Sequence, residues 1–383
     1  MRNQGLDILR FVAVILVLGR HLNLPSDSPT ALVIWQRGGW IGVDLFFVLS
    51  GFLVSSLLFK EIKRSGSVNV KRFLIRRAFK LYPAFWFFLA FSVALKVLTH
   101  NPPAIRFLLG ELFFLQNYLG GVWNHTWSLA VEEHFYLGIA MLVSYITASE
   151  FPTDQKSLRA IPVVFFFVSF VCFALRIITL FTFPEYSHEA YLFGTHLRID
   201  SLFFGVLLSY LFHFNALEDK LLCVPTYILY LLGCLLLSPA FIFQLETHRW
   251  IPVAGVVLFY IGGGTILLGA LRMRQSSSSL CKLLAALGAA SYSIYLWHMP
   301  VNSWGASMIR KLTGFDDFIV YATTYLLGSL AFGWLMNRII EAPVLFVRDV
   351  LFPSNTSPLQ PSEQPPEPEV ESDEGGRLST LMR

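Results

Sequence analysis

Arg10 and His21 have the residue types and the spacing to place a cation and a base on one helix face. They lie eleven positions apart in an apolar stretch. At 100° per residue, this spacing returns to within about 20° of the same face, with about 16 Å between the two along the axis. One face of this stretch would then present a guanidinium near one membrane surface and an imidazole near the other. The alternative is that Arg10 pairs with Asp7, its i,i+3 neighbour, and that His21 is an interfacial residue.

A second candidate for proton transfer is the adjacent carboxylate pair Glu132 and Glu133, at the start of another apolar stretch. Neighbouring residues on a helix point about 100° apart, so only one of the two is expected to face a given cavity. A carboxylate in that position can transfer a proton or orient a histidine. The alternative is an acidic pair solvated at the membrane interface.

Ser291, Tyr295 and His298 occupy positions i, i+4 and i+7 of a third apolar stretch and predict one polar stripe on a helix. Such a stripe favours the lining of a cavity without specifying a reaction. No metal site is expected, because the four cysteines have no C-x-x-C spacing and no histidine is placed to complete a set of ligands.

The cluster of Arg76, Arg77 and Lys80 is the strongest candidate for an anion site. Guanidinium groups bind phosphate through two parallel hydrogen bonds, and lysine adds a point charge. The alternative is that these residues only fix membrane orientation through the excess of positive charge in cytoplasmic loops.

The elements that must position these residues are predicted to be transmembrane helices. The chain of 383 residues is 55% hydrophobic and only 14% charged, with a mean hydropathy of +0.59. A bilayer core of about 30 Å requires roughly 20 apolar residues in a helix. The expected fold is therefore all-α and polytopic, with ten spans near residues 6–23, 40–59, 80–99, 130–149, 161–183, 199–214, 221–243, 251–271, 289–309 and 318–340. The apolar stretch 105–118 is shorter and fits a re-entrant or interfacial segment.

Basic residues in the loop between the second and third spans predict the orientation. Residues 60–80 contain eight Lys or Arg and a single acid, Glu61, so this loop and both termini are expected in the cytoplasm. Residues 1–348 are predicted to form the transmembrane domain. Residues 349–383 are predicted to form a disordered cytoplasmic tail that is rich in acids and proline.

With these residues in view, the sequence resembles the family 3 membrane acyltransferases, which include O-acetylases of O-antigen, exopolysaccharide and peptidoglycan. The resemblance runs from Gly5 to Pro343. The motifs that carry it are GLDILRFVAVILVLGRH from Gly5, GWIGVDLFFVLSGFLVS from Gly39, RRAFKLYPAFW from Arg76, WSLAVEEHFYL from Trp127, RIDSLFFG from Arg198, SYSIYLWHMPV from Ser291 and EAP from Glu341. Lys80 departs from the family, which has arginine there, and His134 stands where the family often has glutamine.

The resemblance implies an O-acyltransferase that uses cytoplasmic acyl-CoA, with acetyl-CoA expected, and a carbohydrate or glycolipid acceptor. It makes His21, with Arg10, the catalytic pair and places acyl-CoA binding at Arg77 and Lys80. We expect the coenzyme A phosphates on Arg76, Arg77 and Lys80, and His21 as the general base. Glu132 or Glu133 is expected to orient the His21 ring or to stabilise its charged form. A polar crevice is expected to be lined by Asp44, Ser128, Ser291, Tyr295 and His298.

The expected location is a bacterial inner membrane, in contact with lipid and without a nucleic-acid partner. A transporter or flippase is the rival class, because intramembrane charges and ten spans suit it equally. A transporter would be expected to contain internal repeats, and the sequence shows none clearly.

Overall fold

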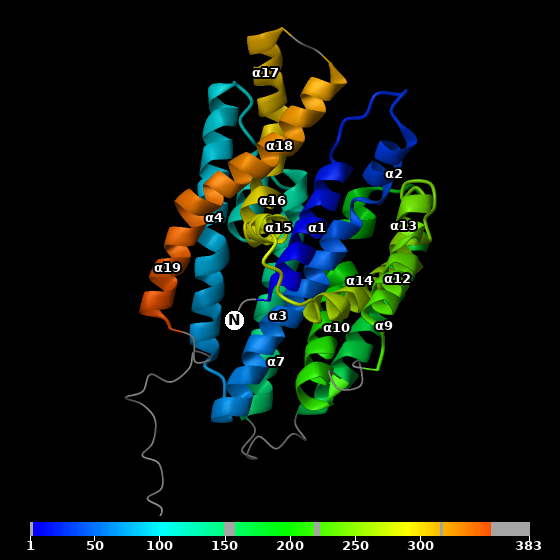
Figure 1. Cartoon of the computed structure of the whole chain (residues 1–383), viewed down its shortest axis with the longest axis vertical. Coiled ribbons are helices and arrows are strands. Elements are labelled where there is room, and N and C mark those ends of the chain that lie inside the picture. The colour runs from blue at the N-terminus through cyan, green and yellow to red at the C-terminus, as the bar shows by residue number, and fades with distance from the viewer. Residues whose placement is uncertain (1–2, 149–157, 218–222, 315–316, 354–383) are drawn as a thin grey trace, which may run out of the picture.

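A computed structural model describes residues 3–148, 158–217, 223–314 and 317–353, and within these ranges every regular element is helical (Figure 1). The longer helices are α1 (Gln4–Arg20), α3 (Ile41–Ser65), α4 (Val70–Leu98), α7 (Trp127–Ala148), α9 (Ala160–Thr182), α10 (Thr195–Phe214), α12 (Thr226–Leu237), α14 (Val256–Leu271) and α18 (Phe318–Met336). The shorter ones are α2 (Thr30–Gly38), α5 (Ile105–Leu112), α6 (Gln116–Leu119), α13 (Pro239–Ile242), α15 (Ser279–Ala289), α16 (Ser291–Pro300), α17 (Ala306–Thr313) and α19 (Ala342–Leu351). The all-α prediction is confirmed.

Seven helical segments in the described part are long and apolar enough to cross a membrane. They are Ile41–Ser65, Val70–Leu98, Asn124–Ile146, Ala160–Thr182, Glu189–Phe214, Ile251–Leu271 and Phe318–Leu351. Each coincides with one of the ten predicted spans. The stretch predicted as 199–214 is longer than expected, because a helical turn, Glu189–Phe193, precedes α10.

The other three predicted spans fall on helical segments of a different kind. Residues 6–23 correspond to α1, which has 17 residues, and residues 221–243 to the short apolar segment Thr226–Ile242. Residues 289–309 belong to a pair of segments, Ser279–Ala289 and Ser291–Leu312, that is bent by 68°. The count of ten spans therefore stays a prediction at these three places.

The crossing of α3 and α10 sets the spacing of the central helices. A Cβ atom on Gly51 would lie 2.0 Å from the Leu202 carbonyl oxygen, and one on Gly205 would lie 2.3 Å from that of Val48. Only glycine permits this approach of two helix backbones. The close contact holds Asp44 of α3 beside Arg198 of α10.

Residues 105–118 do not form a span. They form α5 and α6, and buried Glu111 of α5 accepts hydrogen bonds from the Val122 amide at 3.0 Å and from the Thr126 hydroxyl at 2.8 Å. Residues 120–126 are thereby held against the helices ahead of α7.

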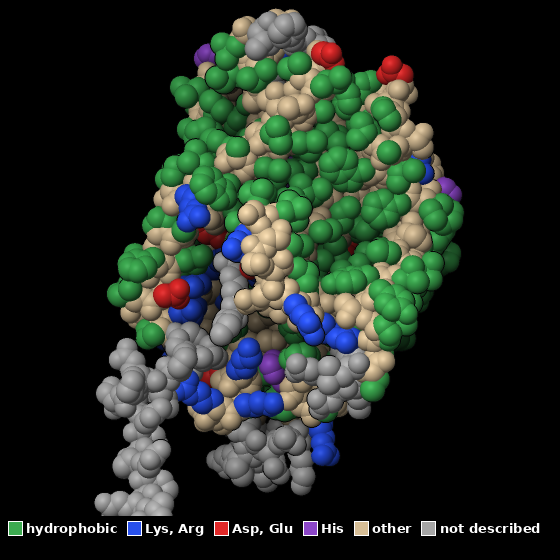
Figure 2. Space-filling model, viewed as in Figure 1, with side chains coloured by type: hydrophobic (Ala, Val, Ile, Leu, Met, Phe, Trp, Pro, Cys, Tyr) green, Lys and Arg blue, Asp and Glu red, His purple; other side chains and the backbone are tan. Residues whose placement is uncertain are grey.

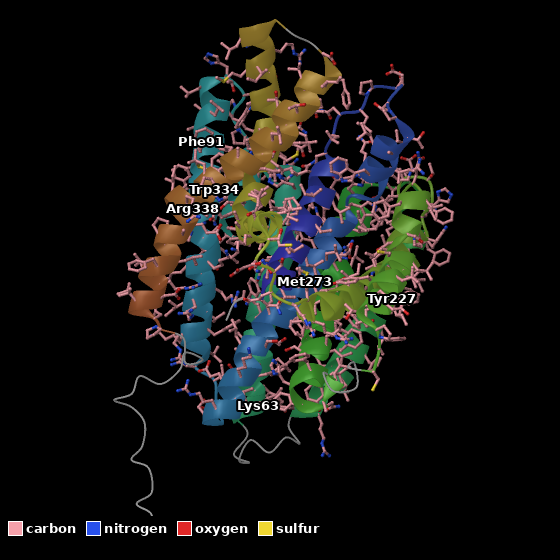
Figure 3. The ribbon with its side chains drawn as sticks, viewed as in Figure 1. Lys63, Phe91, Tyr227, Met273, Trp334 and Arg338 are labelled. Atoms are coloured by element: carbon pink, nitrogen blue, oxygen red, sulfur yellow. The ribbon has the colours of Figure 1, made fainter. Side chains whose placement is uncertain are left out.

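Charged and apolar side chains are separated on the surface. Figure 2 shows Lys and Arg side chains in the lower half of one face and mostly hydrophobic side chains over its upper half. Lys63 lies at the lower end of the molecule, whereas Phe91, Trp334 and Tyr227 are exposed on its flanks (Figure 3). This distribution is typical of a helical bundle with lipid around its sides. Helix α19 continues to Leu351, past the predicted domain boundary at residue 348, and residues 354–383 of the predicted tail lie outside the described part.

Candidate active site

In the described part of the chain, two of the cavities between the helices bring together most of the residues selected from the sequence. The larger, of about 970 Å³, is called here the basic pocket and is lined by Arg10, Lys60, Arg77, Lys80, Arg338 and Arg348. The smaller, of about 490 Å³, is called the histidine pocket and is lined by His21, His125 and His188. Val43 and Tyr295 line both pockets, so the two cavities meet at these side chains.

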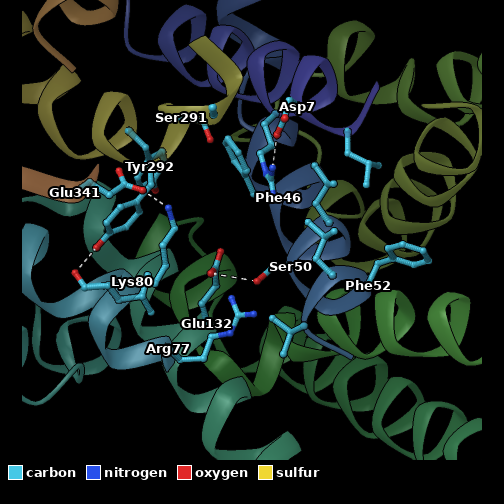
Figure 4. Close-up of a pocket in the computed structure, with 18 of the residues that line it drawn as sticks. Asp7, Phe46, Ser50, Phe52, Arg77, Lys80, Glu132, Ser291, Tyr292 and Glu341 are labelled. Carbon is cyan, nitrogen blue, oxygen red and sulfur yellow. Dashed lines mark hydrogen bonds and ion pairs between the residues drawn. The ribbon is translucent and has the colours of Figure 1, made fainter. Parts of the chain in front are cut away.

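Helix α1 connects the pockets as the spacing of its residues predicts. Arg10 lines the basic pocket, and His21, which caps the other end of α1, lines the histidine pocket. Arg10 Nη1 also forms an ion pair with Asp7 Oδ1 at 2.5 Å, as expected of i,i+3 neighbours (Figure 4). The Asp7 pairing and the cavity-facing position of Arg10 thus occur together.

Contacts with backbone carbonyls orient His21 and two neighbouring histidines. A carbonyl oxygen can only accept, so the contact of His21 Nδ1 with the Val17 oxygen, at 3.0 Å, places a proton on Nδ1. His21 Nε2 is then the unprotonated atom of the neutral ring and can act as a base. In the same way, His298 Nδ1 donates to the Tyr295 oxygen at 2.6 Å and His125 Nε2 to the Leu296 oxygen at 3.2 Å.

The three imidazole rings form a cluster beside the histidine pocket. The ring centroids of His21 and His298 are 5.0 Å apart, and those of His298 and His125 are 4.8 Å apart. His298 and His125 are buried. The sequence did not single out His125, because it lies before the apolar run of α7 and has no regular spacing from the other two histidines.

Glu132 and Glu133 point in different directions, as expected of neighbouring residues on a helix. Glu132 lines the basic pocket and accepts hydrogen bonds from the Tyr136 hydroxyl at 2.6 Å and the Ser50 hydroxyl at 3.3 Å (Figure 4). Glu133 points elsewhere and accepts from the Tyr82 hydroxyl. The expectation that one of them orients His21 is wrong, because both are bound to these hydroxyls and the partner of His21 is the Val17 carbonyl.

The predicted anion cluster is only partly assembled at the basic pocket. Arg77 lines it, with its guanidinium 5.8 Å from the Tyr136 ring centroid. Lys80 lines it too but forms an ion pair with buried Glu341 of the EAP motif (Figure 4). Arg76 turns away and pairs with Asp349 at 2.9 Å. The prediction that Arg76 joins Arg77 in one anion site is wrong, because successive residues of a helix point in different directions.

Further cations complete the lining of the basic pocket. Lys60 and Arg338 line it with no carboxylate partner among the described residues, whereas Arg348 pairs with Asp349 at 2.8 Å. Lys60 comes from the end of α3 and Arg338 from the turn after α18. In the sequence, bases of this kind indicate only membrane orientation, and the fold brings them together at one pocket.

The polar stripe lies at the junction of the two pockets. Ser291 and Tyr295 line the basic pocket, and His298 contacts His21 beyond it. The Tyr295 hydroxyl lies 2.7 Å from that of Ser128 and donates to the His125 carbonyl oxygen at 2.6 Å. Ser291, Tyr295 and Ser128 thus lie in the cavity lining, whereas His298, expected there too, is buried and lines neither pocket.

Asp44 does not line either pocket, contrary to expectation. It is fully buried and accepts a hydrogen bond from Arg198 Nη2 at 2.6 Å. A buried carboxylate requires such a partner to compensate for the loss of hydration. Arg198 itself lines the histidine pocket.

Arg20, at the end of α1, and His188 line the histidine pocket and interact with Glu246. Arg20 Nη2 forms an ion pair with Glu246 Oε1 at 2.7 Å and lies 3.2 Å from His188 Nε2. Burial acts to raise the pKa of Glu246, but the hydrogen bond and charge of Arg20 outweigh it and hold that pKa below its ordinary value. Glu246 is therefore an ion-paired carboxylate next to Arg20 and is not part of the pocket lining.

Comparisons with known proteins identify the family of this chain. A family model described as an acyltransferase domain matches residues 3–338. The chain is 29% identical to O-acetyltransferase OatA of Staphylococcus aureus (strain NCTC 8325 / PS 47), over 89% of the chain and 57% of that protein. It is 28% identical to peptidoglycan O-acetyltransferase OatA of Listeria monocytogenes serovar 1/2a, over 89% of the chain and 55% of that protein.

The chain thus spans little more than half the length of these relatives. No solved structure matches it. Because the family model covers residues 3–338, which is most of the sequence, this chain belongs to the family 3 acyltransferases.

Proposed function

We propose that this chain is a membrane O-acyltransferase that moves an acyl group, with acetyl expected, from cytoplasmic acyl-CoA to a hydroxyl of a cell-envelope carbohydrate. The observation that carries the proposal is the pair of cavities that meet at Val43 and Tyr295. One cavity gathers cations and the other holds a histidine with one nitrogen available as a base. An anionic donor and a hydroxyl acceptor need these two environments.

The donor would bind in the basic pocket with its phosphates on Arg77, Lys60 and Arg338. These side chains line the pocket without a carboxylate partner in the described part of the chain. Lys80 is already paired with Glu341, so its role would be to hold the pocket wall and tune the charge near the donor. Arg76 is left out of the site because its partner is Asp349.

The reaction would take place at the histidine pocket. His21 Nε2 takes the proton of the acceptor hydroxyl while the oxygen attacks the thioester carbonyl carbon. The C–O bond forms, the C–S bond breaks, and the departing thiolate of coenzyme A takes up the proton. A covalent acyl-His21 intermediate would need the same ring in the same place, and mass spectrometry of protein quenched during turnover distinguishes the two routes.

The proposed orientation places the basic pocket at the cytoplasm and the histidine pocket on the outer side. The eight bases within residues 60–80 support it, because short cytoplasmic loops carry an excess of Lys and Arg. Acyl-CoA is a cytoplasmic metabolite and envelope carbohydrate lies outside, so the two substrates would reach the junction from opposite faces.

The test is the substitution His21→Ala in the full chain, with His248→Ala as the matched control. His248 lines neither pocket. The loss of a general base typically lowers the rate by about 10² to 10⁴. We expect that loss for His21→Ala, with an unchanged membrane level and unchanged acyl-CoA binding, and wild-type rates for His248→Ala. A His21→Ala rate within a few-fold of wild type would remove His21 from catalysis.

A further inference from the structure

We infer that the histidine pocket binds one pyranose ring of the acceptor, and that Arg198 selects a sugar with a carbonyl or carboxylate substituent over one with a free ammonium group. This inference rests on the proposed function, which identifies the ligand of the pocket as the acceptor. It adds a chemical basis on which one acceptor sugar is bound in preference to another. Arg198 belongs to the RIDSLFFG motif, for which the sequence analysis gave no role.

The Arg198 guanidinium is buried and only partly hydrogen-bonded. The side chain is 1% exposed and lines the histidine pocket. Its Nη2 donates to Asp44, but Nε and Nη1 have no hydrogen-bond partner. Leaving buried donors unsatisfied costs free energy, so a ligand oxygen that accepts from them gains a strong, charge-assisted hydrogen bond.

A second buried arginine, Arg176, provides a comparison outside the two pockets. Arg176 Nη2 lies 2.5 Å from both oxygens of Asp200, and its Nε donates to the Leu197 carbonyl oxygen at 2.8 Å. Only one of its nitrogens, Nη1, lacks a partner, and Arg176 lines neither pocket. The two arginines share the same burial and the same kind of carboxylate partner but differ in access to a cavity.

Aromatic rings give the pocket a surface suited to a sugar ring. Trp127 stacks on Phe193 with centroids 5.0 Å apart and an interplanar angle of 11°, and both line the pocket. The Arg198 guanidinium lies 5.8 Å from the Trp127 ring centroid. Trp40 is a third aromatic side chain in the lining. A pyranose offers apolar C–H groups to such rings and hydroxyls to the polar groups beside them.

The charge of the lining decides between sugar classes. Among the described residues, the side chains that line the histidine pocket include Arg20 and Arg198 but no Asp or Glu. An ammonium group on the acceptor would meet cations and lose hydration without a carboxylate to replace it. A carbonyl or carboxylate oxygen that reaches Arg198 would instead accept from its unpaired Nε and Nη1.

The experiment measures binding without acyl-CoA, so that its failure is separate from a failure of acyl transfer. The full chain is placed in lipid nanodiscs, because glycoside detergents would compete for the site. Saturation-transfer NMR then compares three probes: methyl N-acetylglucosaminide, methyl glucuronide and methyl glucosaminide. The first two carry a carbonyl and a carboxylate, and the third carries an ammonium group.

We expect the first two probes to bind and the third to bind at least ten-fold more weakly. Arg198→Lys retains the charge beside Asp44 but loses the planar fork and should weaken both good probes at least ten-fold. Arg176→Lys is the matched control, because it alters an equivalent buried ion pair away from the pockets, and should bind the probes like wild type. Equal binding of all three probes, or unchanged binding by folded Arg198→Lys, would overturn the inference.

A second variant keeps the test decisive if Arg198→Lys does not fold. Trp127→Leu leaves the Arg198–Asp44 pair in place and removes the aromatic surface. It should also weaken binding of methyl N-acetylglucosaminide at least ten-fold. Wild-type affinity in folded Trp127→Leu would exclude a sugar ring from this part of the pocket.

Discussion

At the scale of single residues, spacing along a helix predicted which side chains face the cavities, and contacts between helices decided their partners. The Arg10 and His21 spacing and the stripe of Ser291 and Tyr295 place these residues along the pockets as expected. The pairing of Lys80 with Glu341 joins residues 261 positions apart, which no periodic pattern reveals. The sequence therefore predicts which face of a helix a residue occupies. The partner that compensates its charge is known only from the folded structure.

Kinetic measurements can test the role of Arg77 in donor binding, which differs from that of Lys80. Arg77→Ala should raise the apparent KM for acyl-CoA about ten-fold or more, because it removes a cation of the basic pocket that has no carboxylate partner in the described structure. The raised KM should be specific to the nucleotide-bearing donor and absent with a short thioester that lacks phosphates. Lys71→Ala is the control, since Lys71 is exposed on the same helix and lines neither pocket. An unchanged KM for Arg77→Ala would make the cluster a signal for orientation alone.

Lys80 should respond differently from Arg77. Lys80→Ala would leave the buried Glu341 carboxylate without its ion-pair partner, and loss of one partner of a buried pair costs about 3–5 kcal/mol. We expect a marked fall in melting temperature, whereas Lys80→Arg should retain both stability and donor binding. A stable, fully active Lys80→Ala protein would contradict the role assigned to this pair.

At the scale of elements, long uniform apolar runs predicted seven spans that meet length and hydropathy criteria, but the break in another predicted span was not anticipated. The seven helical segments that satisfy length and hydropathy coincide with predicted spans. The bend of 68° between Ser279–Ala289 and Ser291–Leu312 falls inside an apolar region, so hydropathy alone does not locate it. Likewise, α5 and α6 are held by a buried carboxylate rather than by their own length.

That carboxylate, Glu111, gives a prediction for pH. It lies outside the spanning helices, and burial raises its pKa from 4.5 to about 7, against hydrogen bonds that lower it. Between these pH values the folded chain keeps a proton that the unfolded chain has lost. Stability should therefore fall as pH rises from 4.5 to 7 and then level off, by about 3 kcal/mol in all.

Glu111→Gln tests this relation because glutamine retains an oxygen acceptor for Thr126 and Val122 but does not titrate in this range. Its melting temperature should exceed that of wild type at pH 8 by several degrees and match it near pH 5. Glu185→Gln, at an exposed position, should keep the wild-type pH profile. A wild-type slope in Glu111→Gln would show that another group controls the pH dependence.

At the scale of the whole molecule, the proposed function requires the two pockets to open toward opposite sides of the membrane. Reporter fusions after Arg64 and at the C-terminus should report the cytoplasm, and a fusion at Pro103 should report the outer side. This result is expected from the basic residues between the second and third predicted spans. An outer signal from the Arg64 fusion would place the basic pocket where acyl-CoA does not occur.

Transfer of an isotope across a sealed membrane tests the central claim most directly. The full chain is reconstituted in proteoliposomes, ¹³C-acetyl-CoA is supplied on the side of the basic pocket, and an N-acetylglucosamine oligosaccharide is enclosed on the side of the histidine pocket. Mass spectrometry then follows the label. The two-pocket mechanism predicts labelled, base-labile O-acetyl esters on the enclosed sugar with wild-type protein and none with His21→Ala. Movement of oligosaccharide across the membrane without consumption of acetyl-CoA or ester formation would contradict the mechanism and indicate a transporter.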